Sequence, residues 1–387
     1  MTKEKSTVPR LRFPGFTDAW KQRKLGEVAE KISQKNLDRQ YVETFTNSAE
    51  FGIISQRDFF EKNISSLDNI SGYYIVNPDD FVYNPRISNL APVGPIKRNK
   101  LGRVGVMSPL YTIFRFSDIH LDFVEKYFDT TIWHRYMELN GDSGARSDRF
   151  AIKDSVFKGL PVPLPTLPEQ EAIGSFFSDL DQLITLHQRK LDDVKELKKA
   201  LLQKMFPKGN GNDFPDLRFP EFTDAWKQRK AMEIFKVVSD KGYADLPILS
   251  ASQELGMIRR DEIGIDIKYD KEAVANYKRV LPGQFVIHLR SFQGGFAWSE
   301  IEGLTSPAYT ILDFKEENSS KFWRNVLTSP NFIKKLETVT YGIRDGRSIS
   351  YSDFSTLNFV IPTLPEQSAI GSFFSDLDQL ITLHQRK

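Results

Sequence analysis

Cysteine is absent from the 387 residues of this chain, and its absence excludes several kinds of chemistry. Disulfide bridges, catalysis by a thiol and zinc sites with cysteine ligands all need cysteine, so none is expected. Only five histidines occur, and none forms an HExxH motif or another paired metal-binding spacing. The sequence also lacks the Gly-x-x-x-x-Gly-Lys-Ser/Thr loop of nucleotide hydrolases. It therefore favours a protein without a catalytic centre of its own.

Long apolar runs and a strong charge of one sign are missing as well. No run of about 18 apolar residues occurs, so no membrane span is expected. The N-terminal residues MTKEKSTVPRLRF lack the apolar core of a secretory signal. Together with the absence of cysteine, these features predict a cytoplasmic protein. The formal net charge is only +2, so any contact with nucleic acid must come from a local patch or be shared with a partner.

Two stretches of the chain occur twice, almost letter for letter. The upstream frame, Leu11–Lys24, returns as Leu217–Lys230 with one difference in 14 residues. The downstream frame, Thr166–Lys190, returns as Thr363–Lys387, again with one difference. Packing alone tolerates many apolar substitutions and does not demand such identity. The repeat indicates one scaffold that presents two different recognition surfaces.

The two inserts between the frames, 36–150 and 236–348, share only scattered residues. Short β-branched or aromatic runs bounded by Gly, Asn, Pro and Asp predict strands in both inserts, and 123–139 predicts a helix. Short segments of weak sequence similarity between the inserts align Arg86 with Arg290, Arg146 with Arg344 and Arg149 with Arg347. The inserts are therefore interpreted as one mixed α/β fold with diverged surfaces.

A long helix is predicted from about Pro168 to Met205, after a proline-rich segment that should end any preceding strand. An apolar stripe of this length needs a partner helix, and the repeated copy is the obvious one. His187 and His384 hold equivalent positions and are interpreted as a polar interruption of the stripe. The residues expected to pack the helices are Phe177, Leu180, Ile184, Leu191, Val194, Leu201, Phe374, Leu377 and Ile381.

These features predict an α+β chain with two pseudo-symmetric halves. The first insert module with its upstream frame covers 1–160, the long helix 161–206 and a linker 207–214. The second module covers 215–361 and the second helix 362–387. Lys387 corresponds to Lys190, after which the first copy continues for 16 residues, so the second helix is expected to be truncated. The sequence does not distinguish a natural end from a shortened chain.

Basic and amide side chains in loop-like settings are the candidates for contact with DNA. Arg pairs bidentately with guanine, Asn and Gln pair with adenine, and Lys mostly contacts phosphate. Residues 94–102 form a glycine-bounded basic loop suited to phosphates. For any single residue, a solvated surface charge is the competing interpretation. The candidates are Gln56, Arg57, Arg86, Asn89, Lys97, Arg98, Lys100, Arg103, Arg146, Arg149, Arg259, Arg260, His288, Arg290, Gln293, Arg344 and Arg347.

The whole arrangement resembles the specificity subunit of type I restriction–modification systems. The resemblance rests on the LRFPGFTDAWKQRK frame before each insert and the LPEQ-x-AIGSFFSDLDQLI frame after it. It implies that each insert is a target-recognition domain reading one half of a bipartite double-stranded DNA site. It also implies that the two long helices pack as an antiparallel coiled coil.

The resemblance further implies that the chain is a non-catalytic subunit. Two methyltransferase (modification) subunits would dock on the helices and bring S-adenosylmethionine for N6 methylation of a flipped adenine. Restriction and translocase subunits would bring ATP and Mg chemistry. Because of the expected truncation, one modification subunit should dock more weakly than on a longer chain. Near-identical frames also suggest that recombination exchanges inserts between related chains.

Two other functions compete with this interpretation. A scaffold that binds proteins or glycans would show neither steep salt dependence nor dependence on duplex sequence. A stand-alone nuclease would require metal-dependent cleavage by the purified chain. The target sequence itself cannot be derived from these residues, because base contacts depend on loop geometry and DNA shape.

Overall fold

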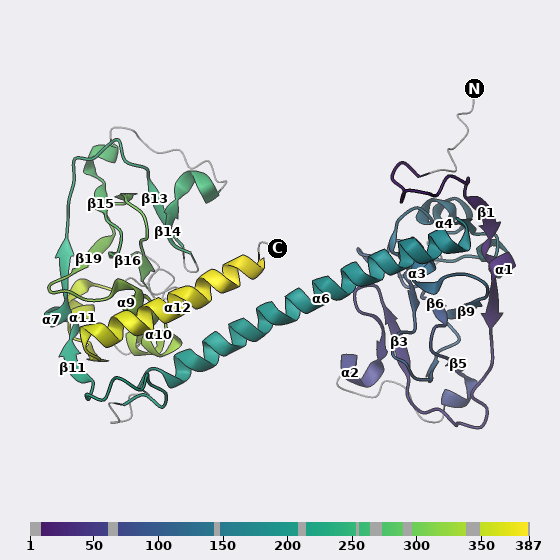
Figure 1. Ribbon diagram of the computed structural model, residues 1–387, viewed down its shortest axis with the longest axis horizontal. Coiled ribbons are helices and arrows are strands. Elements are labelled where there is room, and N and C mark those ends of the chain that lie inside the picture. The colour runs from purple at the N-terminus through teal and green to yellow at the C-terminus, as the bar shows by residue number, and fades with distance from the viewer. Residues whose placement is uncertain are drawn as a thin grey trace. The chain divides into compact units, whose positions relative to one another are not determined.

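The computed structural model describes residues 9–60, 69–142, 148–207, 214–252, 255–263, 273–288, 296–337 and 349–385. Contacts divide the chain into two compact units, unit 1 (Met1–Thr185) and unit 2 (Leu186–Lys387) (Figure 1). Helix α6 (Leu167–Lys204) begins in unit 1 and ends in unit 2, so the division falls inside this helix. The boundaries predicted from the sequence follow the frames instead and stay predictions.

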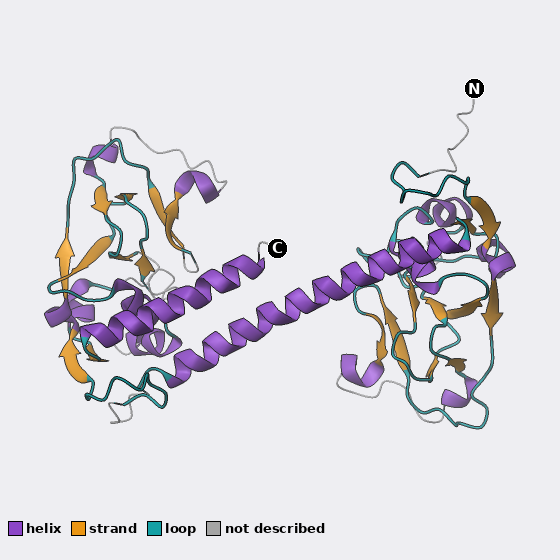
Figure 2. Ribbon diagram, viewed as in Figure 1, coloured by secondary structure: helices purple, strands orange, loops and turns teal. Residues whose placement is uncertain are grey.

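Unit 1 is a mixed α/β module that ends in the first half of α6 (Figure 2). Its largest sheet is antiparallel with the strand order β2-β9-β6-β7, and three two-stranded sheets, β1-β10, β3-β4 and β5-β8, accompany it. The elements are β1 (Lys21–Lys24), α1 (Leu25–Val28), β2 (Ala29–Ile32), β3 (Phe45–Ser48), β4 (Gly52–Ser55), α2 (Gln56–Phe60), the 3₁₀ turn η1 (Ile70–Gly72), β5 (Tyr74–Val76), β6 (Phe81–Tyr83), β7 (Ile96–Arg98), β8 (Gly105–Met107), β9 (Thr112–Phe116), α3 (Leu121–Asp129), α4 (His134–Asn140), α5 (Asp154–Phe157) and β10 (Pro161–Leu164).

Unit 2 repeats this plan. Its four-stranded sheet has the order β12-β19-β16-β17, and the pairs are β11-β20, β13-β14 and β15-β18. The elements are β11 (Lys227–Lys230), α7 (Ala231–Ile234), β12 (Phe235–Val238), β13 (Leu249–Ser252), β14 (Gly256–Arg259), η2 (Arg260–Ile263), η3 (Ala273–Asn276), β15 (Lys278–Val280), β16 (Phe285–Ile287), β17 (Ala297–Trp298), β18 (Gly303–Thr305), β19 (Thr310–Phe314), α9 (Ser320–Leu327), α10 (Pro330–Glu337), α11 (Tyr351–Ser355), β20 (Asn358–Ile361) and α12 (Leu364–Gln385).

The two modules therefore have the same sheet topology, and the prediction of one fold with diverged surfaces is confirmed. Each module has its own aromatic core. In unit 1, Phe81 lies against Phe114 and Phe116, with ring centroids 6.0 and 5.1 Å away. In unit 2, the Phe235 ring lies 4.9 Å from that of Trp323. In the described part of the chain, no helix combines the length and the apolar character needed to cross a membrane.

The proline-rich segment before α6 itself forms a strand, whereas the sequence was expected only to end a preceding strand there. Pro161–Leu164 forms β10 and pairs antiparallel with β1, so that Lys24 faces Pro161 and Gln22 faces Pro163. Proline has no N–H to donate to a neighbouring strand. An edge strand has a neighbour on one side only, so the backbone groups on its other side need no partner strand and prolines are tolerated. The helix begins at Leu167, close to the predicted start at about Pro168.

The helix predicted over 123–139 is two helices, which is a second correction. α3 ends at Asp129, where the Thr130 hydroxyl donates to the Tyr127 carbonyl at 2.7 Å, and α4 begins at His134. The break turns the Trp133 side chain inward, where its Nε1–H donates to the Phe128 carbonyl at 3.1 Å. Ile132, which lies between the two helices, is 67% exposed.

In unit 2, the second half of α6 runs antiparallel to α12, as predicted. Phe206 lies beside Phe374 with ring centroids 6.2 Å apart, Lys198 pairs with Asp378, and the His187 and His384 rings are 6.5 Å apart. The two histidines, equivalent in the repeat, thus face each other. Polar side chains interrupt the apolar contact there, as the sequence indicated.

The residues predicted to pack the helices differ in burial between the units. In unit 2, Leu191 and Phe374 are buried, and Val194, Leu201, Leu377 and Ile381 are partly buried. In unit 1, Phe177 and Leu180 are each 40% exposed and Ile184 is 59% exposed. These side chains are thus more buried in unit 2 than in unit 1, and their role in packing the helices stays a prediction.

The repeated frames fasten each module to its helix through the same arginine–glutamate ion pair. In unit 1, Arg12 pairs with the fully buried Glu169 at 2.6 Å, and Arg218 pairs with Glu366 at 2.7 Å in unit 2. Each arginine also donates to a carbonyl of its own frame, that of Asp18 or Asp224, at 2.6 Å. The LPEQ glutamate is thus the buried anchor of the upstream frame.

The glutamine and glycine of the downstream frame set the distance between the helix and the module. Gln170 Oε1 accepts from the His120 backbone N–H at 3.1 Å, and Gln367 does the same for Ser319 at 3.2 Å. A Cβ on Gly174 would lie 2.9 Å from the Phe123 nitrogen, and one on Gly371 would lie 2.7 Å from the Phe322 nitrogen. Only glycine allows α3 to approach α6 so closely in unit 1, and α9 to approach α12 so closely in unit 2.

Candidate nucleic-acid interface

Each module carries a β-hairpin that is followed directly by a polar residue predicted to contact DNA, and this place is called the reading position. The β3–β4 hairpin of unit 1 is followed by Gln56, whose backbone N–H donates to the Thr44 carbonyl at 2.9 Å. The β13–β14 hairpin of unit 2 is followed by Arg260, whose N–H donates to the Ile248 carbonyl at 2.9 Å. Gln56 and Arg260 are therefore equivalent positions, which the sequence comparison did not reveal. Glutamine suits adenine and arginine suits guanine, so the two modules differ where base readout is expected.

The side chains at these positions are held by the protein. Gln56 Nε2 donates to the Phe45 carbonyl at 3.4 Å, and its Oε1 is buried without a described partner. Arg260 Nε donates to Ser250 Oγ at 3.3 Å. Beside them, Arg57 is exposed at the start of α2, and Arg259 is half-exposed at the end of β14, 3.8 Å from Asp261. The predicted residues of this group thus lie together on each module.

Arg86 and Arg149 also come together, although 62 residues separate them in the sequence. The two residues form an isolated antiparallel bridge, flanked by hydrogen bonds from Ile87 to Asp148 at 3.0 Å and from Phe150 to Pro85 at 2.8 Å. The Arg86 side chain is 70% exposed, and its nearest carboxylate, that of Asp148, is 3.7 Å away. This pair of loops therefore presents cationic side chains at the surface of unit 1.

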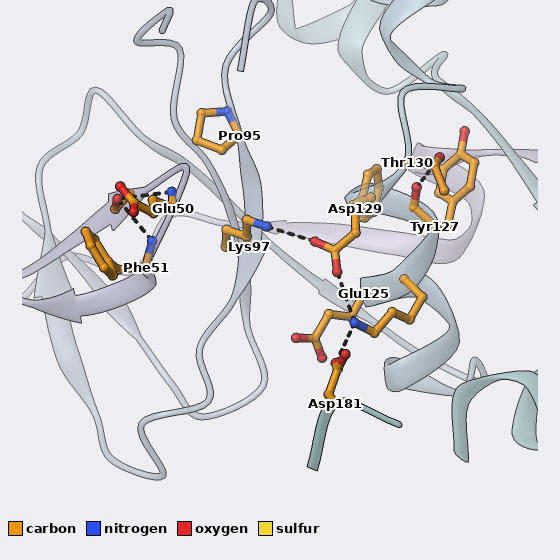
Figure 3. Close-up of polar contacts among 12 residues, drawn as sticks. Glu50, Phe51, Pro95, Lys97, Glu125, Tyr127, Asp129, Thr130 and Asp181 are labelled. Atoms are coloured by element: carbon orange, nitrogen blue, oxygen red, sulfur yellow. Dashed lines mark hydrogen bonds and ion pairs between the residues drawn. The ribbon is translucent and has the colours of Figure 1, made fainter. Parts of the chain in front are cut away.

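The segment 94–102, predicted as a loop, contains the edge strand β7, and its cations are held in ion pairs that the sequence did not indicate. Lys97 pairs with Asp129 at 2.8 Å, Asp129 pairs with Lys126 at 3.3 Å, and Lys126 reaches Asp181 of α6 at 2.5 Å (Figure 3). The view shows this chain of charges crossing from β7 through α3 to α6. Lys97 is thus part of the attachment of the loop to the helix.

Arg98 is the most enclosed cation of this loop. Its side chain is 14% exposed and lies between Asp79, Asp122 and Glu125, with Asp122 at 2.6 Å. Burial opposes its charge, but the hydrogen bonds to Asp79 and Asp122 prevail and raise the pKa of Arg98 above its ordinary value. Lys100 pairs with Glu125 at 3.2 Å. A phosphate would have to compete with these carboxylates.

Arg103 has a bidentate partner in Glu43, with Nε and Nη2 at 2.8 and 2.7 Å from the carboxylate oxygens. These hydrogen bonds hold the pKa of Glu43 below its ordinary value.

Asn89, the remaining described candidate of unit 1, is exposed. In unit 2, the His288 ring lies 6.1 Å from that of Tyr309. Arg146, Arg290, Gln293, Arg344 and Arg347 lie outside the described residues, and the candidate DNA contacts as a set stay predictions.

Metal binding has no candidate site in the described part of the chain. No group of three or more His, Asp or Glu side chains gathers there in a way that could hold a metal ion. The polar features that both modules share are the hairpins and their reading positions. Fold and site together describe a protein with two related modules that present different polar side chains on one scaffold.

The comparisons with known proteins agree with this description. Residues 17–196 match the family model described as "Type I restriction modification DNA specificity domain". Over these residues the chain is similar to the DNA specificity domain of type I restriction–modification systems. The resemblance inferred from the frames is thereby confirmed.

A relative and a solved structure show the extent of the likeness. The chain is 25% identical over 258 residues to the type I restriction enzyme MjaVIII specificity subunit of Methanocaldococcus jannaschii. That match covers 61% of this chain and 59% of the relative, so the chain spans less than two thirds of the relative's length. The type I restriction–modification S subunit from M. genitalium superimposes with a TM-score of 0.57 at 13% identity, over 98% of this chain and 94% of that one. This likeness supports the fold.

Proposed function

We propose that this chain recognises DNA as the non-catalytic specificity subunit of a type I restriction–modification complex. Unit 1 reads one half of a bipartite double-stranded site, and unit 2 reads the other half. The observation that carries the proposal is the pair of modules with one topology and different side chains, Gln56 and Arg260, at the same reading position. One module duplicated with a changed reading residue is what two unlike half-sites require.

The partners follow from the same proposal. Two methyltransferase subunits bind S-adenosylmethionine and methylate adenine, while restriction and translocase subunits use ATP and Mg. This chain positions them on the DNA through its long helices, and the complex works in the cytoplasm. Because the partners carry part of the cationic surface, a net charge of +2 is sufficient for this chain.

The decisive experiment is co-expression with the modification subunit in a host without methylation, followed by genome-wide mapping of N6-methyladenine. Two short half-sites around a fixed gap are the expected result. In parallel, affinity for a duplex that contains the motif should fall steeply as salt rises. Binding that ignores both salt and duplex sequence would favour a scaffold for proteins or glycans instead.

Arg86 offers a more local test of the proposal. Replacing Arg86 by alanine should weaken binding of the assembled complex to its site by about 1–3 kcal/mol, because an exposed arginine on the reading surface loses its base or phosphate contact. Fluorescence anisotropy with a labelled duplex measures the change. Lys236→Ala, at an exposed position on β12, is the control. Equal affinities of the two variants would remove Arg86 from the interface.

A further inference from the structure

The β3–β4 hairpin of unit 1 ends in an exposed apolar side chain. Ser48 Oγ accepts hydrogen bonds from the backbone N–H groups of Glu50 and Phe51 at 3.3 and 3.2 Å, and Gly52 follows with φ of +71° (Figure 3). This turn holds Phe51 at the tip, where it is 59% exposed. The Phe59 ring of α2, 42% exposed, lies 6.0 Å from the Phe51 ring.

The β13–β14 hairpin of unit 2 has a serine and a glycine at the equivalent positions. Ser252 Oγ accepts from the Leu255 N–H at 3.2 Å, and Gly256 follows with φ of +74°. Leu255 is 69% exposed. In the sequence the two turns read Ser-Ala-Glu-Phe-Gly and Ser-Gln-Glu-Leu-Gly, a similarity that lies within inserts that otherwise share only scattered residues.

Turn geometry accounts for the serine and the glycine, but not for the apolar residue. The hydroxyl caps the turn, and glycine takes the left-handed conformation without strain. Neither role asks for a large apolar side chain at the tip, where a polar one would serve. Single exposed apolar residues are ordinary on protein surfaces. One that recurs at the same place in two diverged modules indicates a shared contact.

The setting of the two tips points to the chemistry of that contact. Each hairpin runs into the reading position described above, Gln56 in unit 1 and Arg260 in unit 2, with the cations Arg57 and Arg259 beside them. A two-stranded β-ribbon fits the major groove of B-form DNA, and there an apolar side chain contacts the methyl group of thymine. Cationic neighbours favour the phosphates on either side.

We infer that the two hairpins enter the major groove, and that Phe51 and Leu255 are specificity-determining residues that contact thymine methyl groups, one in each half-site. The inference rests on the proposed function and adds the element and the side chains that read each half. Phe59 supports the Phe51 ring from α2. Phe51 and Leu255 differ in size, so the base pair that each side chain contacts need not lie at the same position in the two half-sites.

The first test compares methylation maps of wild type, Phe51→Ala and Leu255→Ala, each co-expressed with the modification subunit. Phe51→Ala should relax the sequence requirement in one half-site only, and Leu255→Ala in the other half-site only. A wild-type map without a bipartite motif would refute the proposed function. A bipartite wild-type motif that both variants leave unchanged would refute the hairpin inference alone.

The second test replaces each thymine of the mapped site by deoxyuridine and measures binding of the assembled complex. Loss of the contacted methyl should weaken wild-type binding about fourfold, from about 0.8 kcal/mol for one buried carbon. Phe51→Ala should no longer respond at that thymine, and Leu255→Ala should lose the response in the other half-site. Wild-type binding that tolerates every replacement would overturn the assignment of thymine contacts.

Ile132→Ala is the matched control, since Ile132 is 67% exposed on the α3–α4 connection, away from the hairpin in the chain. It should retain both the motif and the response to deoxyuridine. Thermal unfolding of all three variants should match wild type, because the replaced side chains are exposed. If the tip variants instead weakened assembly with the modification subunit while the motif stayed the same, the hairpins would be protein contacts and the inference would be wrong.

Discussion

Replacing Phe374 by alanine should lower the free energy of unfolding of unit 2 by about 3–5 kcal/mol, the range for a fully buried phenylalanine. Phe374 has no exposed surface and lies in a core with Met205, Trp226 and Phe322. The core is closed by the end of α6, where the Phe206 ring lies 5.6 Å from that of Phe322. Loss of the Phe374 ring leaves a cavity that these neighbours cannot fill without moving.

The repeat supplies the matched control for this substitution. Phe177 holds the same position in the first downstream frame, but it is 40% exposed in unit 1. Phe177→Ala should therefore cost at least about 2 kcal/mol less than Phe374→Ala. Chemical denaturation followed by tryptophan fluorescence and by hydrogen exchange assigns the change to one unit, because the two units need not unfold together. Equal losses in the two variants would mean that the Phe177 face is covered in solution.

Replacing Arg218 by alanine should destabilise unit 2 by about 3–5 kcal/mol, because it leaves a buried carboxylate without its cation. Glu366 is fully buried and accepts from both Nε and Nη2 of Arg218 at 2.7 Å. After the substitution, the Trp226 indole N–H, 3.2 Å from the same carboxylate, remains as a neutral donor. One neutral hydrogen bond does not compensate the charge, so the thermal midpoint should fall.

Two further variants separate the charge effect from general damage. Arg23→Ala breaks an exposed pair with Glu27, whose side chains are 49% and 44% exposed, and it should leave the midpoint unchanged. The double change Arg218→Met with Glu366→Leu removes both charges and should recover much of the lost stability. If the double variant were no more stable than Arg218→Ala, the ion pair would not be the source of the loss.

The repeated frames allowed much of the architecture to be predicted. Identical residues in two places indicated two similar modules, and the modules do share a sheet order. The prolines, the apolar rhythm and the absence of internal breakers indicated a long helix, which the structure has over Leu167–Lys204. These features are local or periodic, so they are visible before any packing is known.

Errors arose where distant residues decide local structure. β10 contains two prolines and looks like a connector, but pairing with β1 makes it a strand. The apolar periodicity of 123–139 continues through 130–133, whereas burial of Trp133 breaks the helix there. Tertiary contacts outweighed local preference in both cases.

In the candidate site, too, the sequence indicated the residue types, and tertiary contacts decided their surroundings. A count of basic residues singled out the loop 94–102, but could not reveal that Asp79, Asp122, Glu125 and Asp129 surround its cations. Those carboxylates come from a turn and from α3, up to 32 residues away in the chain. The equivalence of Gln56 and Arg260 was equally invisible, because it is defined by hydrogen bonds to Thr44 and Ile248 and not by matching letters.

By itself, the sequence determined that this protein has two modules of one kind, each joined to a long helix, without cysteine chemistry or a nucleotide-binding loop. Repetition, periodicity and missing residue types are properties of the chain alone. Only the tertiary structure decided which charges are neutralised, which apolar side chains stay exposed and which residues of the two modules correspond. Burial and electrostatic pairing depend on distances between residues far apart in the chain, and folding sets those distances.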